Sequence, residues 1–294
     1  MKNRILLLFA GLLSLFGCRP AGPADPAGRP FCDDYGRTVT VPTAPRRIVS
    51  ASNSVTEIVY ALGAGDLLVG RTDFCTYPPE ARKLPSIGGI TNMSVESILA
   101  LSPDLVISSS MVQKKNVLQL EKMGVPLVSI VEKQHFDALF DNIEAIGTLI
   151  GREAAADSLN RSLRARLRQV QDSIVPGADR PTAYYVVGFG DGGNFTAGGN
   201  TFINDIIAMA GGRNAAAGSE GWSYSLETLM QQDPAYIVIR REDSAAFCRT
   251  EPYSRLTAVK AGRVIPVESG TIDIQGPRNI DAVRLLAKHF RQGQ

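Results

Sequence analysis

SVESILALSPDLVI (residues 94–107) decides the fold, because its pattern returns later in the chain as SLETLMQQDPAYIV (residues 225–238). The serine, the glutamate two residues after it, the proline and the apolar run that follows all recur at a constant offset of 131 residues, 94 to 225. Each copy predicts a short helix that begins at a capping serine, stops before a proline and leads into a buried strand. A unit that occurs twice predicts two related lobes.

Short apolar runs alternate with helical segments around both copies. The predicted strands cover residues 48–50, 67–70, 105–108 and 127–131 in the first half, and 183–187, 236–239 and 264–267 in the second. Ser54 and Glu57 have the spacing of a capping box, which predicts a helix that ends near Leu62. Thr38–Val41 alternates in the manner of a hairpin strand. Alternating strands and helices predict an α/β fold with mostly parallel sheets.

One long helix is expected between the two halves, within residues 151–176. No glycine or proline interrupts residues 152–174, and apolar side chains recur there at helical spacing at Leu159, Leu163, Leu167, Val170 and Ile174. The arginines of this segment fall mostly on its other faces and predict a solvated surface. The segment separates a first lobe at residues 31–150 from a second lobe at residues 177–294.

The amino-terminal sequence is typical of an export signal. Lys2 and Arg4 precede the apolar run of residues 5–16, which is too short to span a bilayer as a helix and suits a signal peptide over residues 1–17. The run ends in Leu-Phe-Gly-Cys18, which resembles the lipobox of bacterial lipoproteins and makes Cys18 the expected lipidation site. An ordinary signal peptide with a fortuitous cysteine is the alternative. The Pro/Gly/Ala-rich residues 18–30 predict a tether.

Composition excludes several classes of protein. The 294 residues are 44% hydrophobic and 20% charged, with 31 Lys+Arg against 29 Asp+Glu. Removal of Lys2 and Arg4 leaves a neutral balance, which argues against binding to duplex nucleic acid. The 2 histidines exclude a three-histidine zinc site, and no cysteine spacing indicates a metal. Cys32, Cys75 and Cys248 allow one disulfide in an exported chain, such as Cys75–Cys248, or remain buried thiols.

No catalytic site is predicted. The chain lacks a G-x-S-x-G nucleophile elbow and an S-x-x-K pair, and His135 and His289 stand apart from any recognisable nucleophile. Residues 188–193 match G-x-G-x-x-G after a strand, but a glycine-rich stretch rather than a helix follows. A dinucleotide site needs that helix to hold the pyrophosphate, so these glycines are interpreted as turns.

Four sequence segments resemble those of a known family: RIVSASNSVTE (47–57), YPPE (77–80), SVESILALSPDLVI (94–107) and AGRVIPV (261–267). Together they resemble the cobalamin and iron-siderophore substrate-binding proteins of ABC importers, over about residues 33–290. The resemblance implies the class III periplasmic-binding-protein fold: two Rossmann-like lobes joined by one long α-helix, with the ligand in the cleft between them. It also implies that a glutamate on each lobe meets arginines of the permease, a role that falls to Glu96 and Glu227.

The expected ligand lies at the carboxyl ends of the strands, where loops leave a parallel sheet. Polar and aromatic side chains of these loops are the candidate ligand-binding residues: Asn53, Tyr77, Asn92, Ser109, Phe189, Trp222, Tyr224 and Arg240. Cobalamin is the first choice of cargo. Haem and a ferric siderophore stay open, because the family's cobalamin binders have tryptophans where this chain has Ile90 and Ser109.

The resemblance also implies the partners and the location. We expect a monomer that is lipid-anchored to a bacterial membrane, in the periplasm or at the cell surface. It would deliver a small-molecule metal chelate to a permease dimer with its cytoplasmic ATPase, without a cofactor, a structural metal, catalysis or nucleic acid. A surface lipoprotein without a transport role is the competing hypothesis, and it requires neither a large cleft ligand nor the two glutamates.

Overall fold

The computed structural model describes residues 28–109, 112–175 and 179–292. The predicted signal peptide, Cys18 and most of the tether lie outside these residues. The first described element, strand β1 (Arg29–Cys32), pairs antiparallel with β2 (Thr38–Val41). Strand β1 therefore overlaps the last residues of the segment predicted as a tether.

The N-terminal lobe is built on a four-stranded parallel sheet in the order β4-β3-β5-β6. Its strands are β3 (Ile48–Ser50), β4 (Leu68–Arg71), β5 (Leu105–Ser108) and β6 (Leu127–Ser129). The helices of this lobe are α1 (Asn53–Ala61), α2 (Val95–Ala100), α3 (Lys114–Lys122) and α4 (Ala138–Leu149), with 3-10 turns at Gly65–Leu67 and Pro79–Lys83.

The C-terminal lobe holds a second four-stranded parallel sheet, in the order β10-β9-β7-β8. Its strands are β7 (Thr182–Val186), β8 (Arg213–Asn214), β9 (Tyr236–Arg240) and β10 (Val264–Val267). The helices are α6 (Phe202–Met209), α7 (Leu226–Gln232), α8 (Arg241–Arg249), α9 (Thr257–Lys260) and α10 (Asn279–Gln292), with 3-10 turns at Gly190–Gly192 and Tyr253–Arg255.

The two lobes have the same topology. In each, the first strand in chain order lies between the second and the third, and the fourth lies outside the third, which gives β4-β3-β5-β6 and β8-β7-β9-β10. In this correspondence, which agrees with the sequence repeat, β5 is equivalent to β9 and α2 is equivalent to α7. The prediction of two related α/β lobes is confirmed.

The capped helices of the repeat form as predicted. Ser94 Oγ accepts a hydrogen bond from the Ser97 amide at the start of α2, and Ser225 Oγ accepts one from the Thr228 amide at the start of α7. The match extends to the other end of the unit. Ser102 and Asp233, each directly before the proline, both have a positive φ, of 46° and 39°.

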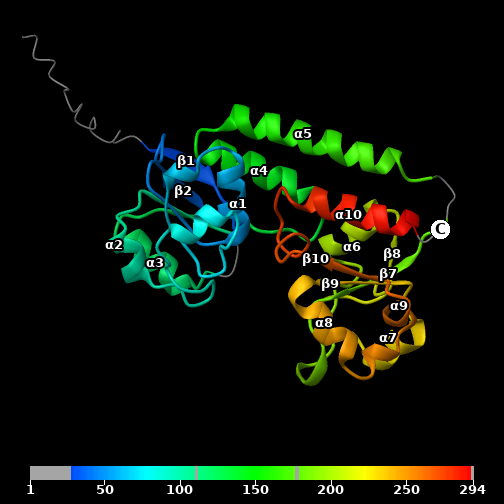
Figure 1. The fold of residues 1–294 in the computed structure, drawn as a ribbon. Coiled ribbons are helices and arrows are strands. Elements are labelled where there is room, and N and C mark those ends of the chain that lie inside the picture. The colour runs from blue at the N-terminus through cyan, green and yellow to red at the C-terminus, as the bar shows by residue number, and fades with distance from the viewer. Residues whose placement is uncertain (1–27, 110–111, 176–178, 293–294) are drawn as a thin grey trace, which may run out of the picture.

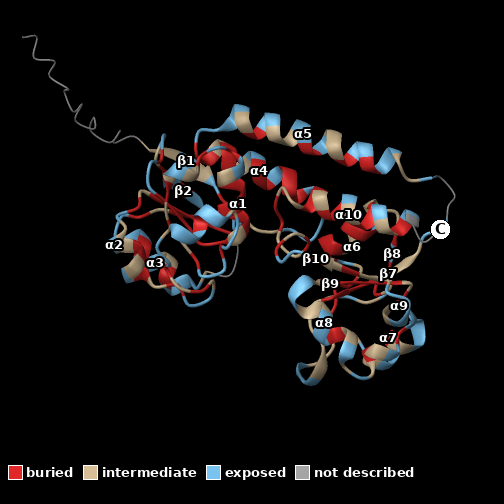
Figure 2. Cartoon of the chain, viewed as in Figure 1, coloured by how far each residue is buried: buried red, intermediate tan, exposed pale blue. Residues whose placement is uncertain are grey.

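The long helix α5 (Glu153–Asp172) connects the lobes. Figure 1 shows it lying along one side of the molecule, across both lobes, with α4 and α10 beneath it. Its 20 residues reach about 30 Å at 1.5 Å per residue. Leu163, Leu167 and Val170 are buried in one cluster that also contains α4 and α10 side chains. The outer face of α5 is exposed, whereas the strands of both sheets are buried (Figure 2).

One predicted cap is wrong. Helix α1 begins at Asn53 with Ser52 as its N-cap, and no side chain caps its amides. The Ser54 hydroxyl instead shares a hydrogen bond with that of Ser52, and Glu57 turns inward. A charged partner from the other lobe holds Glu57 more strongly than a backbone amide of its own helix would, since hydrogen bonds between ionised groups are the stronger kind.

Candidate ligand site between the lobes

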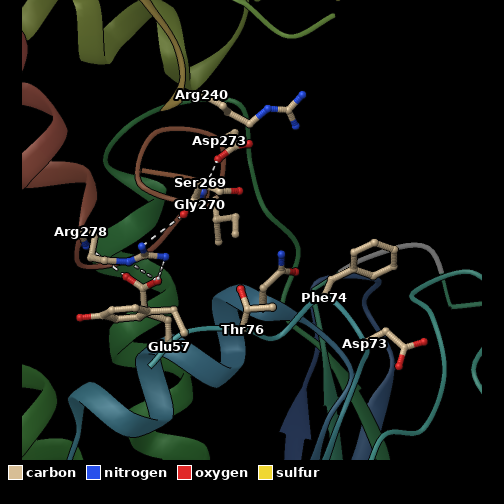
Figure 3. Close-up of a pocket in the computed structure, with 12 residues that line it drawn as sticks. Glu57, Asp73, Phe74, Thr76, Arg240, Ser269, Gly270, Asp273 and Arg278 are labelled. Atoms are coloured by element: carbon tan, nitrogen blue, oxygen red, sulfur yellow. Dashed lines mark hydrogen bonds and ion pairs between the residues drawn. The ribbon is translucent and has the colours of Figure 1, made fainter. Parts of the chain in front are cut away.

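A cavity of about 370 Å³ lies between the lobes. It falls within the range of small-molecule sites. Its lining is drawn in Figure 3 and comes from α1, from the end of β9 and from loops at the carboxyl edges of both sheets: Asn53, Glu57, Asp73, Phe74, Thr76, Tyr77, Arg240, Ser269, Gly270, Asp273, Ile274 and Arg278. Figure 3 shows Arg240 and Asp273 on one side of this space, with Thr76, Phe74 and Asp73 on the other.

The N-terminal wall offers two aromatic rings. Phe74 and Tyr77 follow β4 in one loop, and their side chains are 58% and 43% exposed. Cys75 between them is fully buried and shares a hydrogen bond with Thr72. Exposed rings at the mouth of a cavity suit a large flat or domed ligand, because they supply apolar contact area at small entropic cost.

The C-terminal wall is polar. Arg240 ends β9, and its Nε donates to Asp243 at 2.9 Å while its Nη2 donates to the Val187 carbonyl. Burial acts to lower the pKa of Arg240, but the charges of Asp243, Tyr185 and Asp273 together raise it above its ordinary value. Asp273 accepts a hydrogen bond from the Gly270 amide at 2.9 Å, which shapes the loop before α10.

An ion pair between Glu57 and Arg278 joins the two walls. Glu57 Oε2 lies 2.8 Å from Nη2 of Arg278 and 2.9 Å from its Nε, and the Arg278 amide also donates to Glu57. The Glu57 side chain is 3% exposed. Burial raises the pKa of Glu57 above its ordinary value, and Arg278 offsets part of that rise. The two residues come from α1 and from the turn before α10, so the pair fixes the lobes to each other.

Tyr77 and Gly276 lie against the Glu57–Arg278 ion pair and leave room for it. The Arg278 guanidinium lies over the Tyr77 ring, 3.9 Å from its centroid, which is a cation–π contact. Gly276 lies directly against the carboxylate, and a Cβ there would stand 2.7 Å from Glu57 Oε1. A larger residue at this position would therefore push the two walls apart.

Glu132 is a half-buried carboxylate near the cleft. It lies beyond the end of β6, next to Lys133, whose carbonyl accepts a hydrogen bond from Gln275 of the other lobe. Burial raises the pKa of Glu132 above its ordinary value, and hydrogen bonds with the Ser54 and Ser109 hydroxyls offset part of the rise. Within the described ranges Glu132 has no ion-pair partner.

Three of the eight predicted ligand-binding residues line the cavity: Asn53, Tyr77 and Arg240. Ser109 is buried beside Glu132, and Asn92 is exposed beyond the cavity. Trp222 is 42% exposed and is not part of the cavity lining. It lies in a loop in which the next residue, Ser223, forms an isolated antiparallel β-bridge with the exposed Phe195.

Two predicted aromatic contacts instead pack within the C-terminal lobe. Phe189 stands edge-on to Phe247 and Tyr253, at 5.2 and 5.8 Å between ring centroids. Tyr224 packs against Tyr184 and donates its hydroxyl to the Ala215 carbonyl. Both rings are partly buried and pack against the lobe's second hydrophobic cluster, outside the lining of the cavity.

Sequence reasoning missed several lining residues. Phe74 lies three residues before the predicted Tyr77, in a stretch without a strand or helix signal. That position could have indicated an aromatic side chain in the same loop. Asp273 and Arg278 lie in the loop before α10, and the approach of that loop to α1 of the other lobe left no local trace in the sequence.

Glu96 and Glu227 are exposed, in the first turns of α2 and α7. They occupy equivalent positions on the two lobes, and Figure 1 places both helices away from α5. Gln231 donates to Glu227 at 3.2 Å, and neither glutamate belongs to an ion pair of the described chain. Their carboxylates are therefore available to a partner.

Cys32, Cys75 and Cys248 are all free, so the described residues hold no disulfide and the Cys75–Cys248 bridge does not form. The same residues contain no group of three or more His, Cys, Asp or Glu side chains placed to hold a metal ion. None of their helices combines the length and the apolar character needed to cross a membrane.

Comparison with known proteins identifies the family. A model of the periplasmic binding protein family matches residues 48–269, and the chain belongs to that family. An uncharacterised ABC transporter substrate-binding lipoprotein of Bacillus subtilis, YvrC, is 33% identical over 87% of this chain and 83% of its own length. A cobalamin-binding protein of Halobacterium salinarum is 32% identical over 88% of this chain and 73% of its own length.

Solved structures agree with this assignment. A periplasmic haem-binding protein of Pseudomonas aeruginosa superposes with a TM-score of 0.76 at 30% identity, over 84% of this chain and 92% of that protein. The periplasmic vitamin B12-binding protein BtuF of Vibrio cholerae shares the fold, with a TM-score of 0.73 at 24% identity over 86% and 100% of the two chains. The predicted class III architecture is confirmed.

The ion pair between the lobes can be tested by a double-mutant cycle. Glu57→Leu leaves the Arg278 guanidinium without its partner and should lower the free energy of unfolding by about 3–5 kcal/mol. Glu57→Leu/Arg278→Met removes both charges and should cost less than the sum of the single variants. Urea unfolding of the four proteins measures this coupling. Strict additivity would contradict the proposed link.

The pKa of Glu132 predicts a pH-dependent effect on stability. A carboxyl whose pKa is raised in the folded state binds its proton more tightly there than in the unfolded chain, so stability falls as pH rises above the unfolded value. Glu132→Gln should therefore raise Tm at pH 7.5 by about 2–4 °C and leave it nearly unchanged at pH 4. Glu144→Gln, at an exposed position of α4, is the matched control. An equal change at both pH values would refute the assignment.

Proposed function

We propose that this protein is an extracytoplasmic substrate-binding protein that captures cobalamin in the cleft between its lobes and delivers it to an ABC importer. The observation that carries the proposal is the cavity itself. It lies at the carboxyl edges of two equivalent sheets and is lined by residues of both lobes, with two exposed rings at its N-terminal wall. Such a site binds and releases a ligand without covalent chemistry.

The relatives support cobalamin as the cargo. The Halobacterium protein named for cobalamin binding is similar over most of this chain, and vitamin B12-binding proteins of Yersinia are 29% identical over 68% of it. The alternative is haem, since haem-binding proteins are among the similar structures. The cavity holds only part of a corrinoid, so the remainder would rest on the open surface of the cleft.

The function includes anchoring and docking. Cys18 would carry the lipid that holds the protein at the outer side of a bacterial membrane, and the following residues would act as its tether. Glu96 and Glu227 would meet basic residues of the permease dimer, whose two-fold symmetry matches two equivalent carboxylates. ATP hydrolysis in separate cytoplasmic subunits would then drive release of the cargo.

Calorimetric titration tests the cargo. Cyanocobalamin should bind saturably at one-to-one stoichiometry, and Tyr77→Ala together with Phe74→Ala should weaken it by about 1–3 kcal/mol, because the two rings supply apolar contact. Tyr35→Ala, which truncates an exposed ring away from the cavity, is the control. Binding of haemin but not cyanocobalamin would transfer the assignment to haem, and binding of neither would refute it.

Charge reversal tests the docking residues. Glu96→Lys with Glu227→Lys should abolish cobalamin uptake by cells and leave the Kd for cobalamin unchanged, because both side chains are exposed and lie outside the cavity. Asp141→Lys with Glu144→Lys, at two exposed positions of α4, changes the net charge by the same amount and is the control. Undiminished uptake by the double variant would exclude these two carboxylates as the docking pair.

A further inference from the structure

The cations of the cavity are already used within the protein. Arg278 donates from Nε and Nη2 to Glu57, while its Nη1 faces the Ser269 carbonyl and the Thr271 hydroxyl. Arg240 is paired with Asp243 and also donates to the Val187 carbonyl. Among the residues that the structure describes, no lysine or histidine lines the cavity. An anionic ligand would therefore find no guanidinium without a carboxylate beside it.

Two carboxylates of the lining, those of Asp73 and Asp273, have no cationic partner within ion-pair distance among the described residues. Asp73 on the N-terminal wall accepts a hydrogen bond from the Ser86 hydroxyl, and Asp273 on the C-terminal wall accepts one from the Gly270 amide. Neither forms an ion pair with any described residue. Each keeps acceptor capacity, since an ionised carboxylate has about four lone-pair sites. Both line the same cavity, Asp73 from the N-terminal lobe and Asp273 from the C-terminal lobe.

This charge pattern distinguishes two kinds of cargo. Primary amides on the rim of a ligand are neutral and donate N–H groups, which carboxylates accept. Carboxylates or catecholates on the rim would face Asp73 and Asp273, and like charges brought together at an interface cost affinity. The amide-bearing rim of a corrinoid fits the first description, whereas the propionates of haem fit the second.

We propose that the cleft selects cargo whose polar rim carries neutral amides and rejects cargo with a carboxylate rim, with Asp73 and Asp273 as the specificity-determining residues. The inference rests on the proposed function, because it assumes that the cavity binds a macrocyclic chelate. It extends that function by assigning the selection between cargoes to two acidic side chains rather than to the aromatic rings.

Two matched ligand pairs test this inference by calorimetry on the full chain in lipid nanodiscs at low salt. Dicyanocobinamide and dicyanocobyrinic acid share a corrin ring but carry amides and carboxylates, respectively; haem dimethyl ester and haem form the second pair. The amide corrinoid should bind at least about tenfold more tightly than its acid. Asp73→Asn/Asp273→Asn should reduce that ratio several-fold, and Asp141→Asn, at an exposed position of α4, should not.

The outcomes separate the inference from the function. Equal affinity for the two corrinoids, or an unchanged ratio in the double variant, would overturn the inference while the proposed binding function stands. If only the haem pair binds, a preference for the ester supports the selection rule although cobalamin is lost as cargo, and a preference for the acid overturns both. Binding of none of the four ligands would overturn the proposed function and the inference with it.

Discussion

The contact between Glu57 and Arg278 is the constraint on which the site depends. It joins residues 221 positions apart in the chain, one at the cleft end of each lobe, and several features of the cavity are arranged about it. Tyr77 lies under the guanidinium, Gly276 leaves room for the carboxylate, and Arg278 also donates to the Ser269 carbonyl in the loop before α10. Burial of the pair is costly, so its retention at this place is explained by the geometry that it specifies.

The duplication explains why one fold provides two different surfaces. Loops at the carboxyl edges of the two sheets face each other and line the cavity, whereas the equivalent helices α2 and α7 are turned outward. The lobes have diverged in the loops, where one provides Phe74 and Tyr77 and the other Arg240 and Asp273. They have kept the serine cap and the glutamate in the helices. The two lobes are thus alike at the surface proposed to dock on a symmetric permease and differ at the cavity proposed to hold the ligand.

Much of the fold could be predicted from local patterns. The apolar runs marked seven of the eight strands of the two parallel sheets, and a stripe of leucines marked α5. Strand β8 was missed because its two residues, Arg213 and Asn214, carry no apolar run. Several helices were not predicted either, among them α3 and α8, because each buries few residues and therefore lacks a clear apolar stripe.

The site was harder to predict because it depends on contacts between distant segments. Asn53, Tyr77 and Arg240 could be assigned from their places after strands. Phe189 and Tyr224 fulfil the same rule, yet they pack into the core of their own lobe, because a ring in a loop satisfies either environment. Arg278 and Asp273 could be assigned only once the loop before α10 was known to lie against α1. Periodicity predicts which face of an element is buried but not which distant loop comes to lie beside it.

The connection between the lobes bears on how the cleft binds its cargo. One hydrophobic cluster runs continuously through both lobes and includes side chains of α4, α5 and α10. Hydrogen bonds from Gln275 to the Lys133 carbonyl and from the Phe136 amide to Asp205 link the lobes at the base of the cleft. A large hinge motion would have to break this packing, which costs about 25 cal/mol for each Å² of apolar surface exposed. The cleft is therefore largely formed before the ligand arrives, and a preorganised site loses less of its binding energy to ordering. A preformed cleft then selects its cargo by the fixed shape and the chemistry of its walls, because it adapts neither to a different cargo.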